Sequence, residues 1–138
     1  MRFLYVTFAL LVLVSLSAFH NPKEDRDVPV LEEISRCLVT QNIDQLAELF
    51  DQQVEISLSG RSQAYARAQA RQVLKSFVEQ NPPKNFSFSE QGTSLHMLYA
   101  LGTYNTRDQA FEVDIYLKKR SGEKDYKIDQ MRIEPKKK

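Results

Sequence analysis

Phe111-Glu-Val-Asp-Ile-Tyr-Leu-Lys118 is the stretch of this sequence that decides its fold. Apolar residues alternate here with charged residues or with a tyrosine, and this two-residue period is typical of a β-strand with one buried face and one solvated face. Ser121-Gly-Glu-Lys124 follows, with the composition of a hairpin loop. The end of the chain therefore predicts two antiparallel strands joined by a short connection.

The last strand carries an irregular apolar spacing. Ile128 and Met131 are three residues apart, whereas Met131 and Ile133 are two apart. A regular strand would place Ile128 on the opposite face from the other two. We therefore expect a β-bulge at Asp129 or Gln130 that brings all three apolar residues to the core.

Two more strands are predicted upstream. Phe86-Ser-Phe-Ser89 alternates between apolar and polar residues, and a longer strand is expected from Leu95 to Tyr104. Gly92-Thr93 lies between these strands and is predicted to form the turn. Gly102 interrupts the longer strand, and a glycine at such a position favours curvature of the sheet.

The amino-terminal half of the domain is predicted to be mainly helical. Apolar residues at helical spacing predict helices over 30–40, 43–50 and 66–80. An alternating strand over 54–58 and a turn at Ser59-Gly-Arg-Ser62 separate the last two helices. Helices followed by a run of strands indicate an α+β fold, in which three helices pack on a curved antiparallel sheet and close it into a cone.

The chain opens with the pattern of a secretory signal peptide. A basic start leads into an apolar run from Phe3 to Leu16, and cleavage is expected after Ser17. The alternative is a retained anchor, although the run is shorter than the ~20 apolar residues that span a bilayer. The predicted organisation is a signal peptide (1–17), a flexible lead-in (18–29), one domain (30–134) and a basic tail (135–138). We expect an exported protein, periplasmic or extracellular, with no stable membrane anchor once the signal is cleaved.

The charge balance excludes one class of partner. Lysine and arginine number 19 against 18 acidic residues, which gives a net charge of +1. A balance this close to zero provides no field to attract a nucleic-acid backbone, so no nucleic-acid partner is predicted. The single cysteine, Cys37, lies among apolar helix residues and is expected to pack in the core.

No residue is predicted to be catalytic, to bind a cofactor or to bind a metal. Glu55, Glu112 and Asp114 alternate with core residues, so their carboxylates are expected to point to solvent. His96 is expected to be an exposed or satisfied strand residue, unless the strand register turns it into the cone. Zinc requires three or four protein ligands, and no second histidine or cysteine lies near His96 in the sequence. A zinc site is therefore excluded.

Longer segments combine these patterns. They are Phe50-Asp-Gln-Gln-Val-Glu-Ile-Ser-Leu58, the stretch from Tyr65 to Asn81-Pro-Pro83, Gln91-Gly-Thr93, Ile115-Tyr-Leu-Lys-Lys119 and Met131-Arg-Ile-Glu134. Together they resemble a family of small exported bacterial proteins of unknown function, over residues 30–134. That family is similar in fold to the nuclear-transport-factor-like superfamily, which includes ketosteroid isomerases and polyketide cyclases. The resemblance implies a cone with a pocket between sheet and helices, but no established activity.

The candidate site is a pocket of aromatic and aliphatic side chains. Tyrosines with apolar bodies and polar tips suit a cavity that orients a small ligand. The candidate lining residues are Tyr65, Phe77, Phe88, Tyr99, Phe111, Ile115 and Met131. The favoured hypothesis is a non-enzymatic domain, a monomer or homodimer, that binds a small apolar ligand or a partner protein. The alternatives are a cavity enzyme of isomerase, dehydratase or cyclase type, and a dimerising scaffold module.

Overall fold

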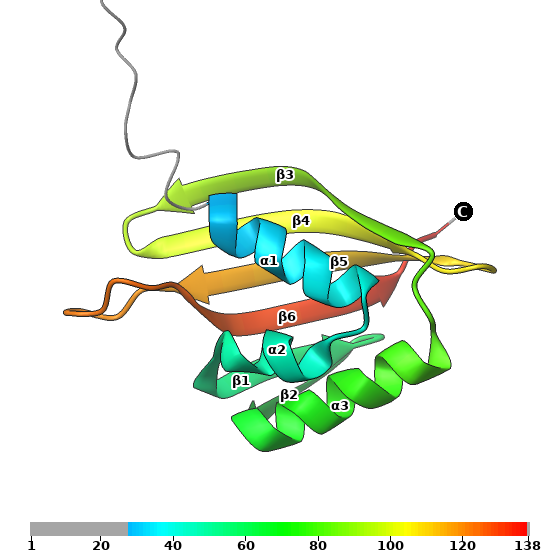
Figure 1. The fold of residues 1–138 in the computed structure, drawn as a ribbon, viewed down its shortest axis with the longest axis horizontal. Coiled ribbons are helices and arrows are strands. Elements are labelled where there is room, and N and C mark those ends of the chain that lie inside the picture. The colour runs from blue at the N-terminus through cyan, green and yellow to red at the C-terminus, as the bar shows by residue number, and fades with distance from the viewer. Residues whose placement is uncertain (1–27, 138) are drawn as a thin grey trace, which may run out of the picture.

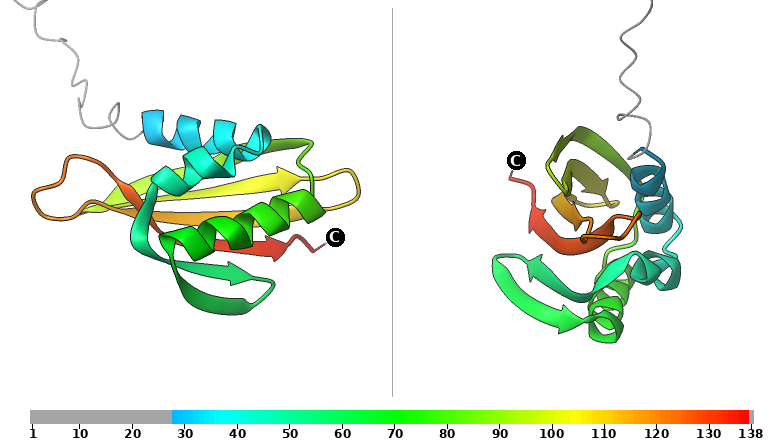
Figure 2. Two further views of the ribbon diagram at one scale, coloured as in Figure 1. Left: turned by 60° about the horizontal axis from the view of Figure 1, so that its bottom comes forward. Right: turned by 90° about the vertical axis from the view of Figure 1, so that its left-hand side faces the viewer.

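The computed structural model describes residues 28–137, so the predicted signal peptide and most of the lead-in lie outside the described residues. The elements are α1 (Val28–Val39), α2 (Ile43–Glu48), β1 (Phe50–Leu58), β2 (Arg61–Ala66), α3 (Arg67–Gln80), β3 (Asn85–Ser94), β4 (Met97–Asn105), β5 (Ala110–Lys118) and β6 (Lys127–Pro135). All three helices lie on one side of a six-stranded curved sheet (Figure 1, Figure 2). The predicted α+β class is confirmed. None of the helices in this range combines the length and hydropathy needed to cross a membrane.

The helices form where apolar residues recur on one face. In α1, Leu31, Ile34 and Leu38 are buried against the rest of the domain, as their helical spacing predicts. Asn42 caps α2, because its side-chain oxygen accepts a hydrogen bond from the backbone N–H of Gln45 (3.2 Å). The short α2 then contacts both α1 and α3 and joins the three helices into one layer.

The sheet is mixed rather than antiparallel. Its strand order is β2-β1-β6-β5-β4-β3. β1 and β6 run parallel, and every other neighbouring pair is antiparallel. The prediction of an antiparallel sheet is therefore wrong at the β1–β6 pair. Because most of the domain lies between β1 and β6 in the chain, β6 can return beside β1 in the same direction, which a short hairpin would not allow.

One strand of the sheet is absent from the sequence-based prediction. Residues Arg61–Ala66 form β2, an edge strand paired with β1, where the sequence predicts a turn that leads directly into a helix. The turn itself is confined to Ser59 and Gly60, both with positive φ. β2 escapes prediction because nearly all of its residues are exposed, so it shows no apolar alternation. The helix after it begins at Arg67, close to its predicted start.

The β3–β4 turn is displaced from its predicted position. The sequence predicts the turn at Gly92-Thr93, but the chain reverses at Leu95 and His96, where Leu95 has a φ of 54°. Gly92 lies within β3, opposite Tyr99. A Cβ atom at Gly92 would lie 2.6 Å from the Tyr99 ring, so this glycine permits the close approach of the ring instead of forming a turn.

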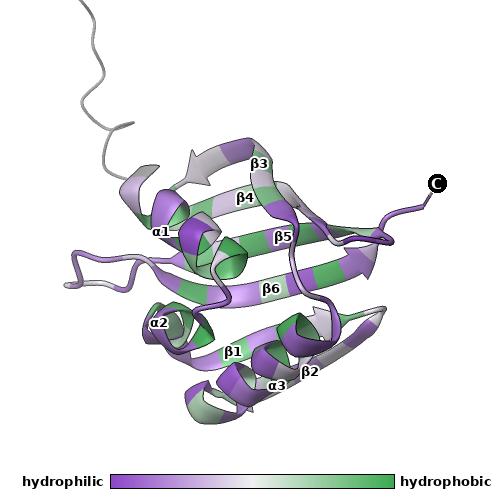
Figure 3. Ribbon diagram, turned by 45° about the vertical axis from the view of Figure 1, so that its right-hand side comes forward, coloured by the Kyte–Doolittle hydropathy of each residue, from purple (hydrophilic) through white to green (hydrophobic). Residues whose placement is uncertain are grey.

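The predicted bulge in β6 is confirmed. Tyr116 pairs with Gln130 and Leu117 pairs with Ile128, which leaves Asp129 as the extra residue. The bulge brings the apolar residues of β6 to the helix-covered face, and Figure 3 shows the alternation of apolar and polar residues along β5 and β6. The buried residues that this alternation gathers are Phe111, Val113, Ile115, Leu117, Ile128, Met131 and Ile133.

Candidate functional site

The space between α3 and the sheet is filled by aromatic side chains. The Phe77 ring lies 5.6 Å from the Tyr104 ring and 5.1 Å from the Phe111 ring, measured between centroids. The Tyr104 hydroxyl donates a hydrogen bond to the backbone oxygen of Asn81 (2.5 Å). Burial raises the pKa of Tyr104 to about 12, because the phenolate would be desolvated there. The group therefore stays neutral and serves as a donor that holds the end of α3.

Four of the predicted pocket residues belong to this interior. Ile115 and Met131 are fully buried and face each other on β5 and β6. Phe111 is buried on the same face, and Phe77 covers it from α3. These side chains fill the core, and none of them lines a surface hollow described below.

The other three predicted pocket residues lie apart from one another. Tyr65 lines a hollow between β2 and α3, and Phe88 lines a groove between α1 and β3. Tyr99 lies on the face of the sheet away from the helices, because the buried residues of β4 are its neighbours Leu98 and Ala100. The structure therefore does not bring the predicted set together.

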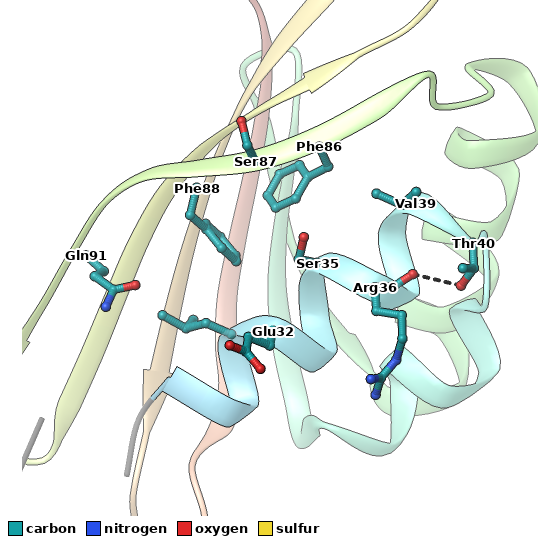
Figure 4. Close-up of a pocket in the computed structure, with 10 residues that line it drawn as sticks. Glu32, Ser35, Arg36, Val39, Thr40, Phe86, Ser87, Phe88 and Gln91 are labelled. Carbon is teal, nitrogen blue, oxygen red and sulfur yellow. Dashed lines mark hydrogen bonds between the residues drawn. The ribbon is translucent and has the colours of Figure 1, made fainter. Parts of the chain in front are cut away.

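Between α1 and β3 lies a surface hollow of about 520 Å³, which we call the α1–β3 groove. Its β3 wall contains Phe86 and Phe88, and its α1 wall contains Leu31, Ser35 and Val39, which follow one another at helical spacing. Figure 4 shows the two phenylalanines reaching from β3 towards α1. The remaining lining residues are Glu32, Arg36, Thr40, Ser87 and Gln91.

The β3 wall of the groove depends on a glycine. Phe86 and Phe88 make an edge-to-face contact with ring centroids 4.8 Å apart. Gly102 of β4 lies beside them, and a Cβ atom there would lie 2.7 Å from Cζ of Phe86 and 2.8 Å from the backbone oxygen of Ser87. The missing side chain lets Phe86 lie close to the sheet, which keeps the groove open.

Sequence reasoning missed most of this groove. Of its apolar walls, only Phe88 was predicted to line a site. Val39 is the residue that could have indicated the groove. It lies outside the buried stripe of α1 and is 41% exposed. An apolar residue beside the core stripe of a helix, one turn after the small Ser35, indicates a surface that the core does not cover.

One sequence-based expectation about charge is wrong. Asp114 lies on the sheet face away from the helices, as predicted, but it is only 8% exposed. Arg132 lies opposite on β6 and binds the Asp114 carboxylate through Nε (2.9 Å) and Nη2. This hydrogen-bonded contact raises the pKa of Arg132. Glu112 and Glu55 are exposed, and Glu55 accepts a hydrogen bond from the Ser62 hydroxyl (2.5 Å).

Two further residues of the described range, His96 and Cys37, carry distinctive side-chain chemistry. His96 is exposed in the β3–β4 turn. Cys37 is buried, and desolvation raises the pKa of its thiol, which disfavours the nucleophilic thiolate. Within residues 28–137, histidine, cysteine, aspartate and glutamate side chains do not gather in any group of three that could hold a metal ion.

Comparison with known proteins places this fold. A family model for a domain of unknown function, DUF4783, matches residues 31–134. A DUF4783 family protein from Bacteroides ovatus has 23% identity and a TM-score of 0.71, over 76% of this chain and 94% of that chain. A second, from Bacteroides uniformis, has 19% identity and a TM-score of 0.72, over 78% of this chain and 97% of that chain.

More distant structures share the architecture. An NTF-2 like protein of unknown function from Burkholderia xenovorans has 12% identity and a TM-score of 0.59, over 81% of this chain and 84% of that chain. Among curated proteins, none matches this chain. The chain has the nuclear-transport-factor-like α+β fold, and it belongs to the DUF4783 family of domains of unknown function.

Proposed function

We propose that this chain is an exported, non-enzymatic binding domain and that the α1–β3 groove receives an apolar ligand or a segment of a partner protein. One observation carries the proposal: the exposed Val39 and the half-buried Phe88 line this groove together, whereas Tyr104 and Phe111, between α3 and the sheet, are buried. Val39 is 41% exposed and Phe88 is half-buried, yet both lie beside a hollow large enough for a ring or an aliphatic side chain.

The charges of the molecule favour binding over the alternative of an isomerase, dehydratase or cyclase. Proton abstraction in such a cavity needs a carboxylate surrounded by apolar side chains. The two buried carboxylates of the described residues, Asp51 and Asp114, are each paired with an arginine. Arg120 lies 2.9 Å from Asp51, and Arg132 holds Asp114 on the outer face of the sheet. Each of these carboxylates is therefore held in an ion pair instead of standing alone among apolar side chains.

Export is tested by the mass of the released protein. The proposal predicts that the protein leaves the cell interior and that its mature chain begins at Ala18, because the apolar run before Ser17 acts as a cleaved signal. Fractionation followed by intact-mass spectrometry measures both. A full-length chain that stays in the cell interior would contradict this part of the proposal.

Groove binding is tested by NMR titration of the ¹⁵N-labelled exported protein with indole. The amides of α1 and β3 that flank Ser35 and Phe88 are expected to shift in a saturable way. Ser35→Trp should fill the groove and reduce the indole affinity by at least tenfold, since a tryptophan ring occupies the space of the ligand. Ser76→Trp, on an exposed site of α3, is the matched control and should bind indole normally. Indole that shifts no residue of the groove, or that binds both variants equally, would refute the proposal.

A further inference from the structure

One wall of the α1–β3 groove is an edge strand. Within residues 28–137, β4 is the one strand that pairs with β3, and β3 lies at the end of the sheet (Figure 1). The outer edge of β3 therefore presents backbone N–H and C=O groups beside the groove. A ligand in this position can use two kinds of contact at once: hydrogen bonds along the edge and apolar contacts within the groove.

We propose that the occupant of the groove is an extended segment of a partner protein that adds to the sheet as an antiparallel neighbour of β3. The inference rests on the proposed function, because it takes the groove as the binding site and specifies what enters it. In this mode of recognition, main-chain hydrogen bonds provide affinity and pockets for alternate side chains provide specificity.

The spacing of the α1 wall fits an extended chain. Side chains that point to the same face of a strand are about 6.8 Å apart. Leu31, Ser35 and Val39 follow one another along α1 with a rise of about 6 Å per step. Two apolar side chains of the segment, at positions i and i+2, can therefore lie on either side of Ser35. The small Ser35 side chain leaves this space between the larger Leu31 and Val39.

The charges around the groove favour one direction of the segment. Of the charged residues that line the groove, Glu32 of α1 lies nearer to Gln91 than Arg36 does, so this end is acidic. Arg36, one helical turn later on α1, lies farther from Gln91, towards the other end of the groove. An antiparallel neighbour of β3 begins at the acidic end and finishes at the basic end. A segment with a basic residue before its apolar pair and an acidic residue after it is therefore complementary to the groove.

The β3 bulge limits how far the pairing can extend. The register between β3 and β4 shifts between Phe88 and Glu90, and the hydroxyl of the intervening Ser89 donates a hydrogen bond to the backbone oxygen of Leu101 (3.2 Å). A bulge bends an edge strand and interrupts its ladder. Beside the apolar part of the groove, uninterrupted pairing is therefore limited to Asn85–Phe88, before the bulge, and the site suits a short motif.

The test uses the synthetic peptide Lys-Thr-Val-Thr-Phe-Thr-Glu and the ¹⁵N-labelled exported protein. Saturating peptide is expected to shift the amides that line the groove and to slow hydrogen exchange of the outward-facing amides of Asn85–Phe88 by about tenfold or more. The charge-reversed peptide, Glu-Thr-Val-Thr-Phe-Thr-Lys, keeps the composition and should bind at least threefold more weakly.

N-methylated peptides separate edge pairing from simple groove binding. Alternate residues of a strand direct their N–H groups to opposite sides. One peptide is methylated on the valine and phenylalanine nitrogens, and a second peptide on the threonine nitrogens. One of these two methylated peptides should therefore lose binding to the groove, and the other should bind as the unmodified peptide does. Equal effects of the two methylations, or unchanged exchange of the β3 amides, would overturn the inference. If indole still binds the groove in that case, only the inference fails; if indole fails as well, the proposed function fails with it.

Discussion

The helix layer meets the curved sheet in two ways. Against α3, the partly buried Phe77 contacts Tyr104 and Phe111, and both of these rings are buried. Against α1, the corresponding gap to Phe86 and Phe88 faces the small Ser35, and a hollow of about 520 Å³ remains at the surface. The fold therefore does not by itself determine where a pocket lies. The volume of the side chains on each helix decides it.

The largest effect is expected from emptying the filled region. Met131→Ala removes a fully buried side chain, and the cavity and lost burial should lower the free energy of unfolding by about 2–5 kcal/mol. Urea denaturation measures this value. Met97→Ala is the matched control, because Met97 is half-buried on the outer face and should lose less than about 1.5 kcal/mol. Equal losses for the two variants would show that the region around Met131 is not tightly packed.

The alkaline stability of the filled region provides the next test. The pKa of Tyr104 is about 12 in the folded protein, against an ordinary value of 10.0, so the folded state keeps a proton that the unfolded state releases above pH 10. The free energy of unfolding should therefore fall between pH 10 and pH 12, by up to about 3 kcal/mol in total. Chemical denaturation at each pH measures the fall. Tyr104→Phe should remove this component, and an unchanged pH profile in the variant would contradict the assignment.

The groove can be altered through its glycine. Gly102→Ala places a methyl group within 3 Å of Phe86 and of the Ser87 backbone, so Phe86 must move into the groove or β3 must shift. We expect a loss of about 1–3 kcal/mol in stability, together with weaker indole binding. Gly122→Ala is a control for the binding measurement: it strains a residue of positive φ in the β5–β6 loop, away from the groove, so it should lower stability without changing indole affinity. Normal indole affinity in Gly102→Ala would show that Phe86 does not shape the groove.

The smallest effect on stability is expected at the exposed wall. Val39→Ala removes apolar surface that is 41% exposed, so the free energy of unfolding should change by less than about 1 kcal/mol. The same substitution should lower the indole affinity by a larger fraction than it lowers the stability, because the ligand covers Val39. Parallel thermal melts and NMR titrations give the two values. A variant that loses stability but binds normally would place Val39 in the core instead of in the groove.

The sequence predicted those parts of the fold that the core determines. Strict alternation from Phe111 to Lys118 and the irregular spacing of Ile128 and Met131 gave the correct strands and the correct bulge, because buried positions leave a periodic record in the sequence. β2 was not predicted, because an exposed edge strand has no alternation of apolar and polar residues. The displaced turn shows the second limit: Gly92 was interpreted as a turn residue, but it accommodates the Tyr99 ring from the neighbouring strand.

The candidate site was less predictable than the fold. Aromatic residues such as Phe77 and Phe111 are equally suited to a pocket and to a core, and only the packing of α3 shows that they fill the core. The groove depends on absent side chains, at Ser35 and Gly102, and a missing volume gives no apolar signal in a sequence. The Asp114–Arg132 pair joins two strands whose register is altered by a bulge. Alternation alone could place Asp114 on the outer face, but it could not supply its partner.

We infer that side chains fill the space between α3 and the sheet and that binding takes place at the surface between α1 and β3. A crystal of the exported protein soaked with 5-bromoindole tests it most directly, because anomalous scattering locates the bromine without reference to the surrounding atoms. The account predicts a bromine position in the α1–β3 groove, beside Ser35 and Phe88. A bromine position among Phe77, Tyr104 and Phe111 would contradict it.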